Sequence, residues 1–209
     1  MLALLIPVLD RPQNVRPLLD SIRASTTVAH RVLFICDPND QAEREAISRE
    51  AGEMIAPGGS YAAKIRAGIE ATSEPLIMLG ADDVRYHPGW LEAARYYIDA
   101  GAAVVGLNDA RPREHETATH FLITREYAEL PTIDGGPGPL HTGYFHNFPD
   151  RELIETARHR GVYAYAADAV VEHRHHLEGH APFDETYRRG LERFRQDRRT
   201  FMRRSALWS

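Results

Sequence analysis

The sequence predicts one α/β domain in which a mostly parallel sheet carries helices on both faces. Short apolar runs that suit buried strands alternate with segments whose apolar residues recur at helical spacing. This order is typical of parallel sheets, because parallel strands need a crossover connection, usually a helix, between them. With 209 residues, 43% of them hydrophobic and 26% charged, the chain is long enough to bury the core of such a sheet.

The expected elements follow in chain order. Leu2–Val8 is an apolar run with a proline near its end, as expected of a buried strand, and Gln13–Ala24 has its apolar residues on one helix face. The further expected strands are Arg31–Cys36, Pro75–Gly80, Ala102–Leu107, Thr119–Thr124, Val162–Tyr165 and Ala169–Glu172. The further expected helices are Asp40–Ala51, one opened by Gly58-Gly-Ser60 and running to Ala71, one begun by His87-Pro-Gly-Trp90, Arg151–Arg160 and the long polar Asp184–Arg204.

Composition narrows the class of protein. The single cysteine, Cys36, excludes an intramolecular disulfide, so we expect a protein of the reducing cytoplasm. No segment approaches the roughly 20 apolar residues of a membrane span, so no membrane partner is expected. The apolar N-terminus lacks the basic region and cleavage site of a signal peptide and is interpreted as a strand.

Acidic residues follow three of the expected strands, in Pro7-Val-Leu-Asp-Arg11, Asp37-Pro-Asn-Asp40 and Ala81-Asp-Asp83. Because ligands bind beyond the carboxyl ends of parallel strands, these carboxylates are expected to meet in one cleft. Their mutual repulsion favours a divalent cation and a phosphorylated ligand there. Each aspartate also has a local interpretation as a helix cap or turn former, and only the clustering favours the metal.

In this order the motifs resemble family 2 glycosyltransferases of the GT-A fold, over roughly residues 2–176. The segments that carry the resemblance are Pro7-Val-Leu-Asp-Arg11, Asp37, Gly58-Gly-Ser-Tyr-Ala-Ala-Lys-Ile-Arg-Ala-Gly-Ile69, Pro75-Leu-Ile-Met-Leu-Gly-Ala-Asp-Asp83, Tyr144-Phe-His-Asn-Phe-Pro-Asp150 and Val170-Val-Glu-His173. The resemblance implies a GT-A domain over residues 1–180. It also implies transfer of a sugar, with inversion, from a nucleotide-diphosphate sugar, usually a UDP-sugar, with Mn²⁺ or Mg²⁺ as cofactor.

The resemblance assigns roles to ten residues. The implied donor-binding residues are Pro7, Val8, Arg11, Asp37, Lys64, Arg66 and Asp82, with Asp37 on the nucleobase and Lys64 and Arg66 on the diphosphate. Asp83 is the implied main metal ligand, His173 a further one, and Asp150 the base that deprotonates the acceptor hydroxyl. Asp150 is equally well placed to cap the following helix. Ala81 departs from the family motif, which has an acidic residue there, so fewer protein ligands are expected to hold the metal.

Other functions fit parts of the sequence. His173, His175, His176 and His180 suggest a zinc site, but strand geometry would place the first two on one face and His176 on the other. A nucleotidyltransferase would need a glycine-rich basic loop after the first strand, where the chain has Leu9-Asp-Arg-Pro-Gln. A metal-dependent nucleotide-sugar hydrolase and a non-catalytic nucleotide-binding module stay open, the latter because of Ala81.

Residues 181–209 are expected to form an arginine-rich helical tail. Residues 188–204 contain eight arginines and two acidic residues, a net charge of +6, so the rest of the chain, at −5 overall, carries −11. Such a helix either pairs with the acidic body or binds a polyanion. The small size and the excess of arginine, 24 against Lys64 alone, resemble glycosyltransferases of bacterial viruses that modify hydroxymethylated DNA bases. We therefore consider a 5-hydroxymethylated pyrimidine in DNA as the acceptor.

Overall fold

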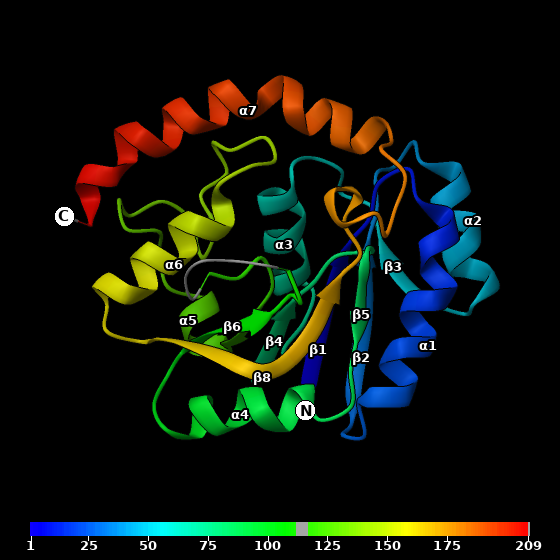
Figure 1. The fold of residues 1–209 in the computed structure, drawn as a ribbon, viewed down its shortest axis with the longest axis horizontal. Coiled ribbons are helices and arrows are strands. Elements are labelled where there is room, and N and C mark those ends of the chain that lie inside the picture. The colour runs from blue at the N-terminus through cyan, green and yellow to red at the C-terminus, as the bar shows by residue number, and fades with distance from the viewer. Residues whose placement is uncertain (112–116, 209) are drawn as a thin grey trace.

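An eight-stranded sheet forms the centre of the computed structural model, which describes residues 1–111 and 117–208 (Figure 1). Its strands lie in the order β3-β2-β1-β4-β7-β6-β8-β5. Their bounds are β1 (Leu2–Pro7), β2 (His30–Ile35), β3 (Glu53–Ile55), β4 (Leu76–Leu79), β5 (Val84–Tyr86), β6 (Val104–Asn108), β7 (Phe121–Thr124) and β8 (Tyr163–His173). Parallel pairing joins β3, β2, β1 and β4, and also β6 and β8, so the expected mostly parallel sheet is confirmed.

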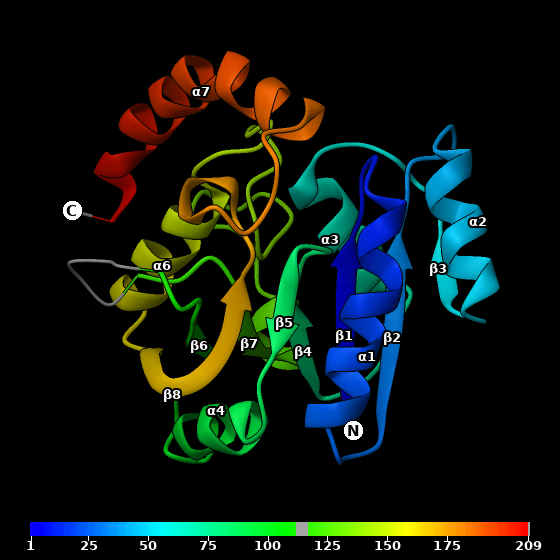
Figure 2. The same cartoon turned by 45° about the vertical axis from the view of Figure 1, so that its right-hand side comes forward.

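Helices cover both faces of the sheet (Figures 1 and 2). They are α1 (Val15–Ser25), α2 (Gln41–Arg49), α3 (Tyr61–Glu70), α4 (Trp90–Asp99), α5 (Arg125–Ala128), α6 (Pro149–His159) and α7 (Glu185–Arg204), with short 3₁₀ turns at Pro12–Asn14, His176–Glu178 and Ser205–Leu207. Buried side chains of α1, α2 and α4 pack in one core layer, and those of α3, α5 and α6 pack in the other. The sheet is therefore the middle layer of three.

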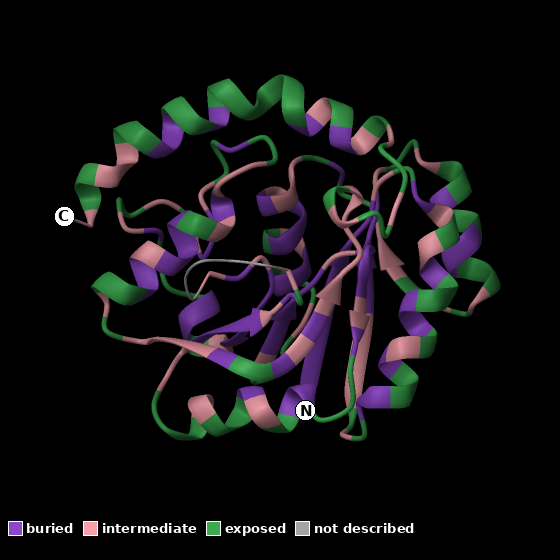
Figure 3. Cartoon of the chain, in the orientation of Figure 1, coloured by how far each residue is buried: buried purple, intermediate pink, exposed green. Residues whose placement is uncertain are grey.

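The first strand and helix form for the reasons that the sequence suggests. All six residues of β1 are buried, because helices cover this strand on both sides and each face needs apolar side chains. In α1, Val15, Leu18, Leu19 and Ile22 are buried at the spacing of one helical face, and the other face is largely exposed. Figure 3 shows this contrast between buried strands and half-exposed helices.

The structure differs from the expected elements on the β8 side of the sheet. The two short strands expected after residue 161 form one strand, β8, which bends around the exposed Ala167 and Asp168 (Figure 1). A register shift after Leu107 accommodates this bend in the pairing with β6. β5, which directly follows the acidic motif, was not expected, and neither was the antiparallel insertion of β7 between β4 and β6. Three-residue strands such as β5 are too short to show a periodic pattern.

The C-terminal helix lies across the molecule at the edge where β1, β2 and β4 end (Figures 1 and 2). Five of its residues are buried and face the body of the protein: Tyr187, Gly190, Asp197, Thr200 and Phe201. The segment expected to be a separate tail is thus packed on the residues 1–180 that were expected to form the domain. None of the described helices combines the length and the apolar character that crossing a membrane requires.

Candidate active site

A cavity of about 1180 Å³ lies beyond the carboxyl ends of β1, β2 and β4 and beneath α7. This is the edge at which the sequence predicted a ligand site, since parallel strands deliver their following loops to one place. Nine of the ten predicted site residues line it: Pro7, Val8, Arg11, Asp37, Lys64, Asp82, Asp83, Asp150 and His173. Ala81, at the position where the family motif is acidic, lines it as well.

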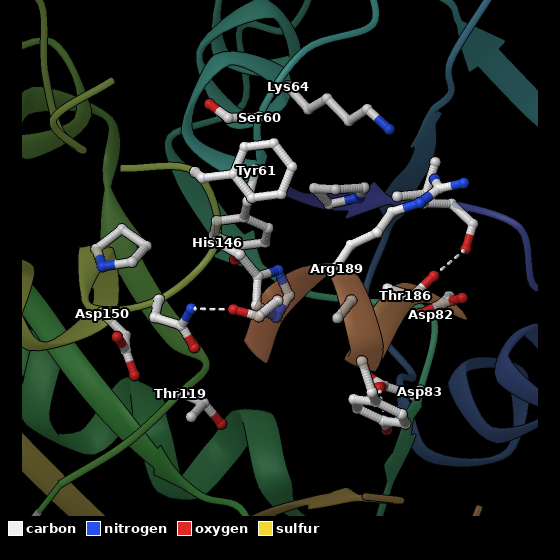
Figure 4. Close-up of a pocket in the computed structure, with 18 of the residues that line it drawn as sticks. Ser60, Tyr61, Lys64, Asp82, Asp83, Thr119, His146, Asp150, Thr186 and Arg189 are labelled. Carbon is white, nitrogen blue, oxygen red and sulfur yellow. Dashed lines mark hydrogen bonds between the residues drawn. The ribbon is translucent and has the colours of Figure 1, made fainter. Parts of the chain in front are cut away.

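Two sides of this cavity differ in construction. We call strand side the part lined by residues 7–11, Asp37, Lys64, residues 81–83, His173 and Tyr187. We call helix side the part lined by residues 145–151 and by Gly190, Phe194 and Arg198 of α7. Figure 4 shows Asp83 and Asp150 on opposite sides of His146, whose ring lies between them.

Arg66 is the predicted site residue that the structure does not bring to the cavity. Its Nε donates to Glu70 Oε1 at 2.8 Å, on a partly exposed surface of α3. Lys64 and Ile65 occupy the buried face of this helix, and a residue directly after them points away at 100° per residue. The prediction that Arg66 faces the diphosphate is therefore corrected: the helical phase directs it to solvent.

Lys64 is buried on the strand side, where its ammonium group has two oxygen partners. Its Nζ donates to the Val8 carbonyl oxygen at 2.7 Å and lies 3.1 Å from Asp37 Oδ2. Ser60 caps α3 by accepting from the Ala63 N–H. The preceding Gly58 has φ +69°, and a Cβ there would meet Asp37 Oδ1 at 3.1 Å, so glycine lets the loop pass beside Asp37. The charge of the lone lysine is thus compensated by the residue predicted to hold the nucleobase.

Arg11 connects the acidic motif to α7. Its Nη1 donates to Asp83 Oδ2 at 2.7 Å, and its Nε donates to Asp184 Oδ2 at the same distance. The guanidinium lies 4.3 Å from the ring centroid of Tyr187 and 3.6 Å from Asp82 Oδ1. Although burial opposes its charge, the hydrogen bond to Asp184 and the nearby carboxylates raise the pKa of Arg11 further. A permanent cation therefore sits against both aspartates of the motif.

Asp83 and His173 are brought together by the pairing of β5 with β8. Val84 pairs with His173, and the Asp83 carbonyl oxygen accepts from the Arg174 N–H at 2.7 Å. This register places Asp83 Oδ1 3.4 Å from His173 Nε2, while Tyr187 donates its hydroxyl to Asp83 Oδ2 at 3.2 Å. Burial alone would raise the pKa of Asp83, but the hydrogen bond and charge of His173, with Arg11, lower it. Burial, and next the charge of Asp83, raise the pKa of Asp82 well above its usual range.

A divalent cation fits the chemistry of this pair. Asp83 offers a carboxylate oxygen, which suits Mn²⁺ or Mg²⁺, and His173 offers an imidazole nitrogen, which Mn²⁺ accepts more readily than the harder Mg²⁺. In the described part of the chain, Oδ2 of the neighbouring Asp82 is buried without a hydrogen-bond partner, a cost that a bound cation would relieve. Residues 1–111 and 117–208 hold no group of three or more His, Cys, Asp or Glu side chains arranged to bind a metal. Most ligands would therefore have to come from a bound diphosphate and water.

The other histidines near the end of β8 have different surroundings. The rings of His175 and His176 lie 4.7 and 4.2 Å, centroid to centroid, from the ring of Tyr187. Burial lowers the pKa of His175 to about 4, so this ring is neutral at pH 7. His180 Nδ1 lies 3.6 Å from Glu172 Oε1. These side chains pack around Tyr187 and Glu172 rather than around a common centre.

The helix side is organised by Asp197, a fully buried carboxylate of α7. It accepts hydrogen bonds from the backbone N–H groups of Phe145, His146 and Asn147, at 2.9, 3.0 and 2.8 Å. α7 can approach this loop because residue 190 is glycine, where a Cβ would lie 2.8 Å from His146 Cδ2. Burial lowers the pKa of His146 against the opposing charges of Asp83 and Asp150. The loop at residues 145–147, which leads to the predicted base Asp150, therefore takes its shape from α7.

Asp150 lies in the first turn of α6 and faces the cavity (Figure 4). The helix begins at Pro149, earlier than expected, and its N-cap is Phe148, which has φ +74° and no side-chain cap. Asp150 is therefore not the N-cap, and that alternative from the sequence is wrong. Phe148 is thus a non-glycine residue in the left-handed region two positions before a candidate base, and such strained backbone, held by neighbouring contacts, is typical of functional sites. The contacts here are made by the Phe148 ring, which packs on Phe194 and Phe201 of α7.

Sequence reasoning missed the contribution of α7 to both sides. Asp184 and Tyr187 hold Arg11 and Asp83, and Asp197 holds the loop at residues 145–147. The signal was available in the apolar and small residues at positions 187, 190, 194 and 201, which share one helical face. The many arginines on the other faces of the helix made this apolar face difficult to recognise.

Comparison with known proteins identifies the fold. No family model matches the chain, and no curated protein matches it in sequence. Among solved structures, a mannosyltransferase from Pyrobaculum calidifontis, in complex with GDP-Man and Mn²⁺, superposes with a TM-score of 0.66 at 14% identity, covering 82% of this chain and 56% of that one. A glucosyl-3-phosphoglycerate synthase from Mycobacterium tuberculosis, in complex with Mn²⁺, UDP and glucosyl-3-phosphoglycerate, gives 0.62 at 15% identity, covering 91% and 77%. TarS from S. aureus gives 0.60 at 9% identity, covering 81% and 59%.

This chain thus spans little more than half the length of the mannosyltransferase and of the TarS fragment. At these identities the likeness is one of fold, and all three proteins share the sheet and helix arrangement described above. The protein therefore has the GT-A fold that its sequence predicted.

Proposed function

We propose that the protein is a metal-dependent glycosyltransferase that moves a sugar from a nucleotide-diphosphate sugar to an acceptor hydroxyl with inversion. The observation that carries this proposal is the placement of Asp83 with His173 on one side of the cavity and of Asp150 across from them. One side can hold a metal and the donor diphosphate, and the other can accept a proton from the attacking group. The complexes of the structural neighbours with Mn²⁺ and UDP or GDP-Man support the same class of donor.

The residues divide the work of one displacement at the anomeric carbon. Asp83 and His173 would hold Mn²⁺ or Mg²⁺, which supplies positive charge to the departing diphosphate. Asp150 takes the proton of the acceptor hydroxyl as its oxygen bonds to the anomeric carbon, while the nucleoside diphosphate leaves with the electrons of the broken bond. Pro7, Val8 and Asp37 line the nucleoside end, and Lys64 keeps Asp37 in place through their ion pair.

The donor site is tested by calorimetry with UDP, GDP and their sugars, with and without Mn²⁺. We expect Asp83→Asn to lose the metal-dependent part of nucleotide binding and Asp37→Ala to weaken binding with or without metal. Because Asp83 also neutralises Arg11, thermal unfolding of each variant checks that the fold survives. Wild-type binding of nucleotide and Mn²⁺ by a folded Asp83→Asn protein would refute the metal assignment.

A transfer assay then separates glycosyl transfer from the alternatives. Nucleotide release from a panel of nucleotide sugars is measured with candidate acceptors and without any acceptor. Release that needs no acceptor identifies a hydrolase, and binding without release identifies a non-catalytic module. Release that rises with an acceptor supports the proposal.

DNA with 5-hydroxymethylated pyrimidines, and hence a bacterial-virus enzyme, stays a prediction based on the arginines of α7. Two of them pair with carboxylates of the body, as the alternative interpretation expected: Arg189 with Asp10, and Arg204 with Asp134 and Glu152. Arg188 instead pairs with Glu185 and Glu192 of α7 itself. Arg195 and Arg199 are exposed and make no ion pair within the described residues. If DNA is the acceptor, replacing Arg195, Arg198 and Arg199 by alanine should flatten the salt dependence of duplex binding by roughly three units. Absence of salt-sensitive DNA binding at low ionic strength would remove DNA as the acceptor.

A further inference from the structure

The cationic side chains that line the cavity fall into two groups. Four of them have a carboxylate partner: Arg11 with Asp83, Lys64 with Asp37, Arg111 with Glu178 and Arg189 with Asp10. Arg151 and Arg198 also line the cavity, yet neither makes an ion pair or hydrogen bond with another side chain among residues 1–111 and 117–208. The helix side therefore carries two positive charges that no carboxylate of the described residues neutralises through an ion pair.

These two arginines line the cavity from different helices. Arg151 directly follows Asp150 in the first turn of α6, and its guanidinium carbon lies 5.2 Å from the ring centroid of Phe201 on α7. Arg198 precedes Phe201 by three residues, so the two lie on neighbouring positions of the same face of α7. Both residues thus lie where α6 meets α7, on the side of the cavity that carries Asp150.

The surroundings favour a ligand with an anionic group. Phe148 and Phe194, whose rings lie 5.3 Å apart, and Phe145 give the helix side an apolar wall. Arg151 and Arg198 are exposed beside this wall, so a ligand can reach both without displacing a buried group. Guanidinium groups match phosphate and carboxylate in shape and bind them with paired hydrogen bonds.

We infer that the acceptor carries a phosphate or carboxylate group, which Arg151 and Arg198 bind while the acceptor hydroxyl lies against Asp150. This inference rests on the proposed glycosyl transfer and names the class of its second substrate. The two arginines would fix the acceptor at its charged end and so direct one hydroxyl to the base. Selectivity against neutral alcohols follows, because a neutral group leaves both guanidinium groups without a partner.

The test measures binding rather than turnover. Protein saturated with UDP and Mn²⁺ is titrated in a calorimeter with glycerol 3-phosphate, with glycerate and with glycerol. Filling the donor site first prevents the anions from binding where the diphosphate belongs. We expect at least one of the two anions to bind, glycerol to bind at least tenfold more weakly, and Arg151→Gln or Arg198→Gln to weaken the anion tenfold or more. The matched control is Arg203→Gln, an exposed arginine of α7 outside the cavity lining, which should leave binding unchanged.

The outcomes separate the two proposals. If UDP binding depends on Mn²⁺ but neither anion binds better than glycerol, or if binding survives both arginine variants, the anionic acceptor is refuted while the donor assignment stands. If the anion binds through Arg151 and Arg198 but UDP does not respond to Mn²⁺, the glycosyltransferase proposal fails and the anion site remains. A duplex DNA competitor distinguishes the sources of the phosphate: displacement of glycerol 3-phosphate indicates a nucleic acid backbone, and no displacement indicates a small acceptor.

Discussion

The strand side and the helix side of the cavity are held in shape by different interactions. On the strand side, buried charges compensate one another: Arg11 lies between Asp83 and Asp184, and Lys64 lies between Asp37 and the Val8 carbonyl. On the helix side, backbone N–H groups of a loop are held by the carboxylate of Asp197. The strand side depends on matched charges, one of which comes from Asp184 at the start of α7, and the helix side depends on a carboxylate further along the same helix.

This difference bears on how each side can bind a ligand. On the strand side Arg11 already pairs with Asp83 and Asp184 and lies 3.6 Å from Asp82 Oδ1, so a metal and a diphosphate must enter by exchanging partners around Asp83 and Arg11. The helix side keeps two arginines without carboxylate partners within the described residues, and they are available to an incoming anion without exchange. Specificity for the donor would therefore be a property of the strand ends, and specificity for the acceptor a property of α6 and α7.

The sharpest test of this division is removal of the base. Asp150→Asn should leave nucleotide and Mn²⁺ binding unchanged but lower the rate of transfer by about 10²–10⁴-fold, the usual contribution of a general base. Transfer is measured in single-turnover experiments with donor in excess, and calorimetry on the same protein reports the donor affinity. Near-native transfer would show that another group removes the proton. The assignment of the helix side to the acceptor would then be wrong.

A second test concerns the dependence of the helix side on α7. Asp197→Ala leaves three loop N–H groups without their acceptor, so we expect the free energy of unfolding to fall by about 2–4 kcal/mol. Transfer should fall as well, while metal-dependent UDP binding should stay close to wild type. Urea denaturation and calorimetry provide both measurements, with the exposed neighbour Gln196→Ala as control. A loss of UDP binding equal to the loss of transfer would mean that the two sides form a single unit.

A third, smaller effect is expected on the strand side from Glu43. This residue is fully buried and accepts the Arg11 N–H at 2.8 Å, and burial, with the nearby charge of Asp40, raises its pKa from 4.5 to about 7. Between these pH values the folded protein keeps a proton that the unfolded chain releases, so stability falls as the pH rises from about 4.5 to 7. In Glu43→Gln this dependence is absent, because the amide does not titrate.

The unfolding free energy of Glu43→Gln relative to wild type should therefore increase by about 2–3 kcal/mol between pH 5 and pH 8. Urea denaturation at several pH values measures the difference, and Glu45→Gln, an exposed position on the same helix, is the control. Parallel stability curves for wild type and Glu43→Gln would show that the buried carboxyl titrates normally. An ionised Glu43 carboxylate would then be stable beside the strand side without a paired cation.

The sequence alone determined much of the strand side. Buried strands, amphipathic helices and acidic residues after strands are local patterns, and the topology of parallel strands brings such strand ends together without further information. The positions of Asp37 and Asp83 at one cavity were predictable for this reason. Lys64 and Asp150 lie in helices, and their place at the cavity was expected only from the resemblance to family 2 glycosyltransferases. The prediction for Arg66 was wrong because the direction of a side chain depends on its position around the helix. Its spacing of two residues from the buried Lys64 would have indicated that it points away from the cavity.

Only the tertiary structure decided what α7 does. Its arginines suggested a solvated or polyanion-binding tail, yet Tyr187, Asp184 and Asp197 reach Asp83, Arg11 and the loop at residues 145–147. These contacts join residues 50 or more positions apart, and no local pattern encodes which partner a buried carboxylate will meet. The cause is physical: a charge can be buried only where the fold supplies its partner, so the partner is known only when both segments are in place.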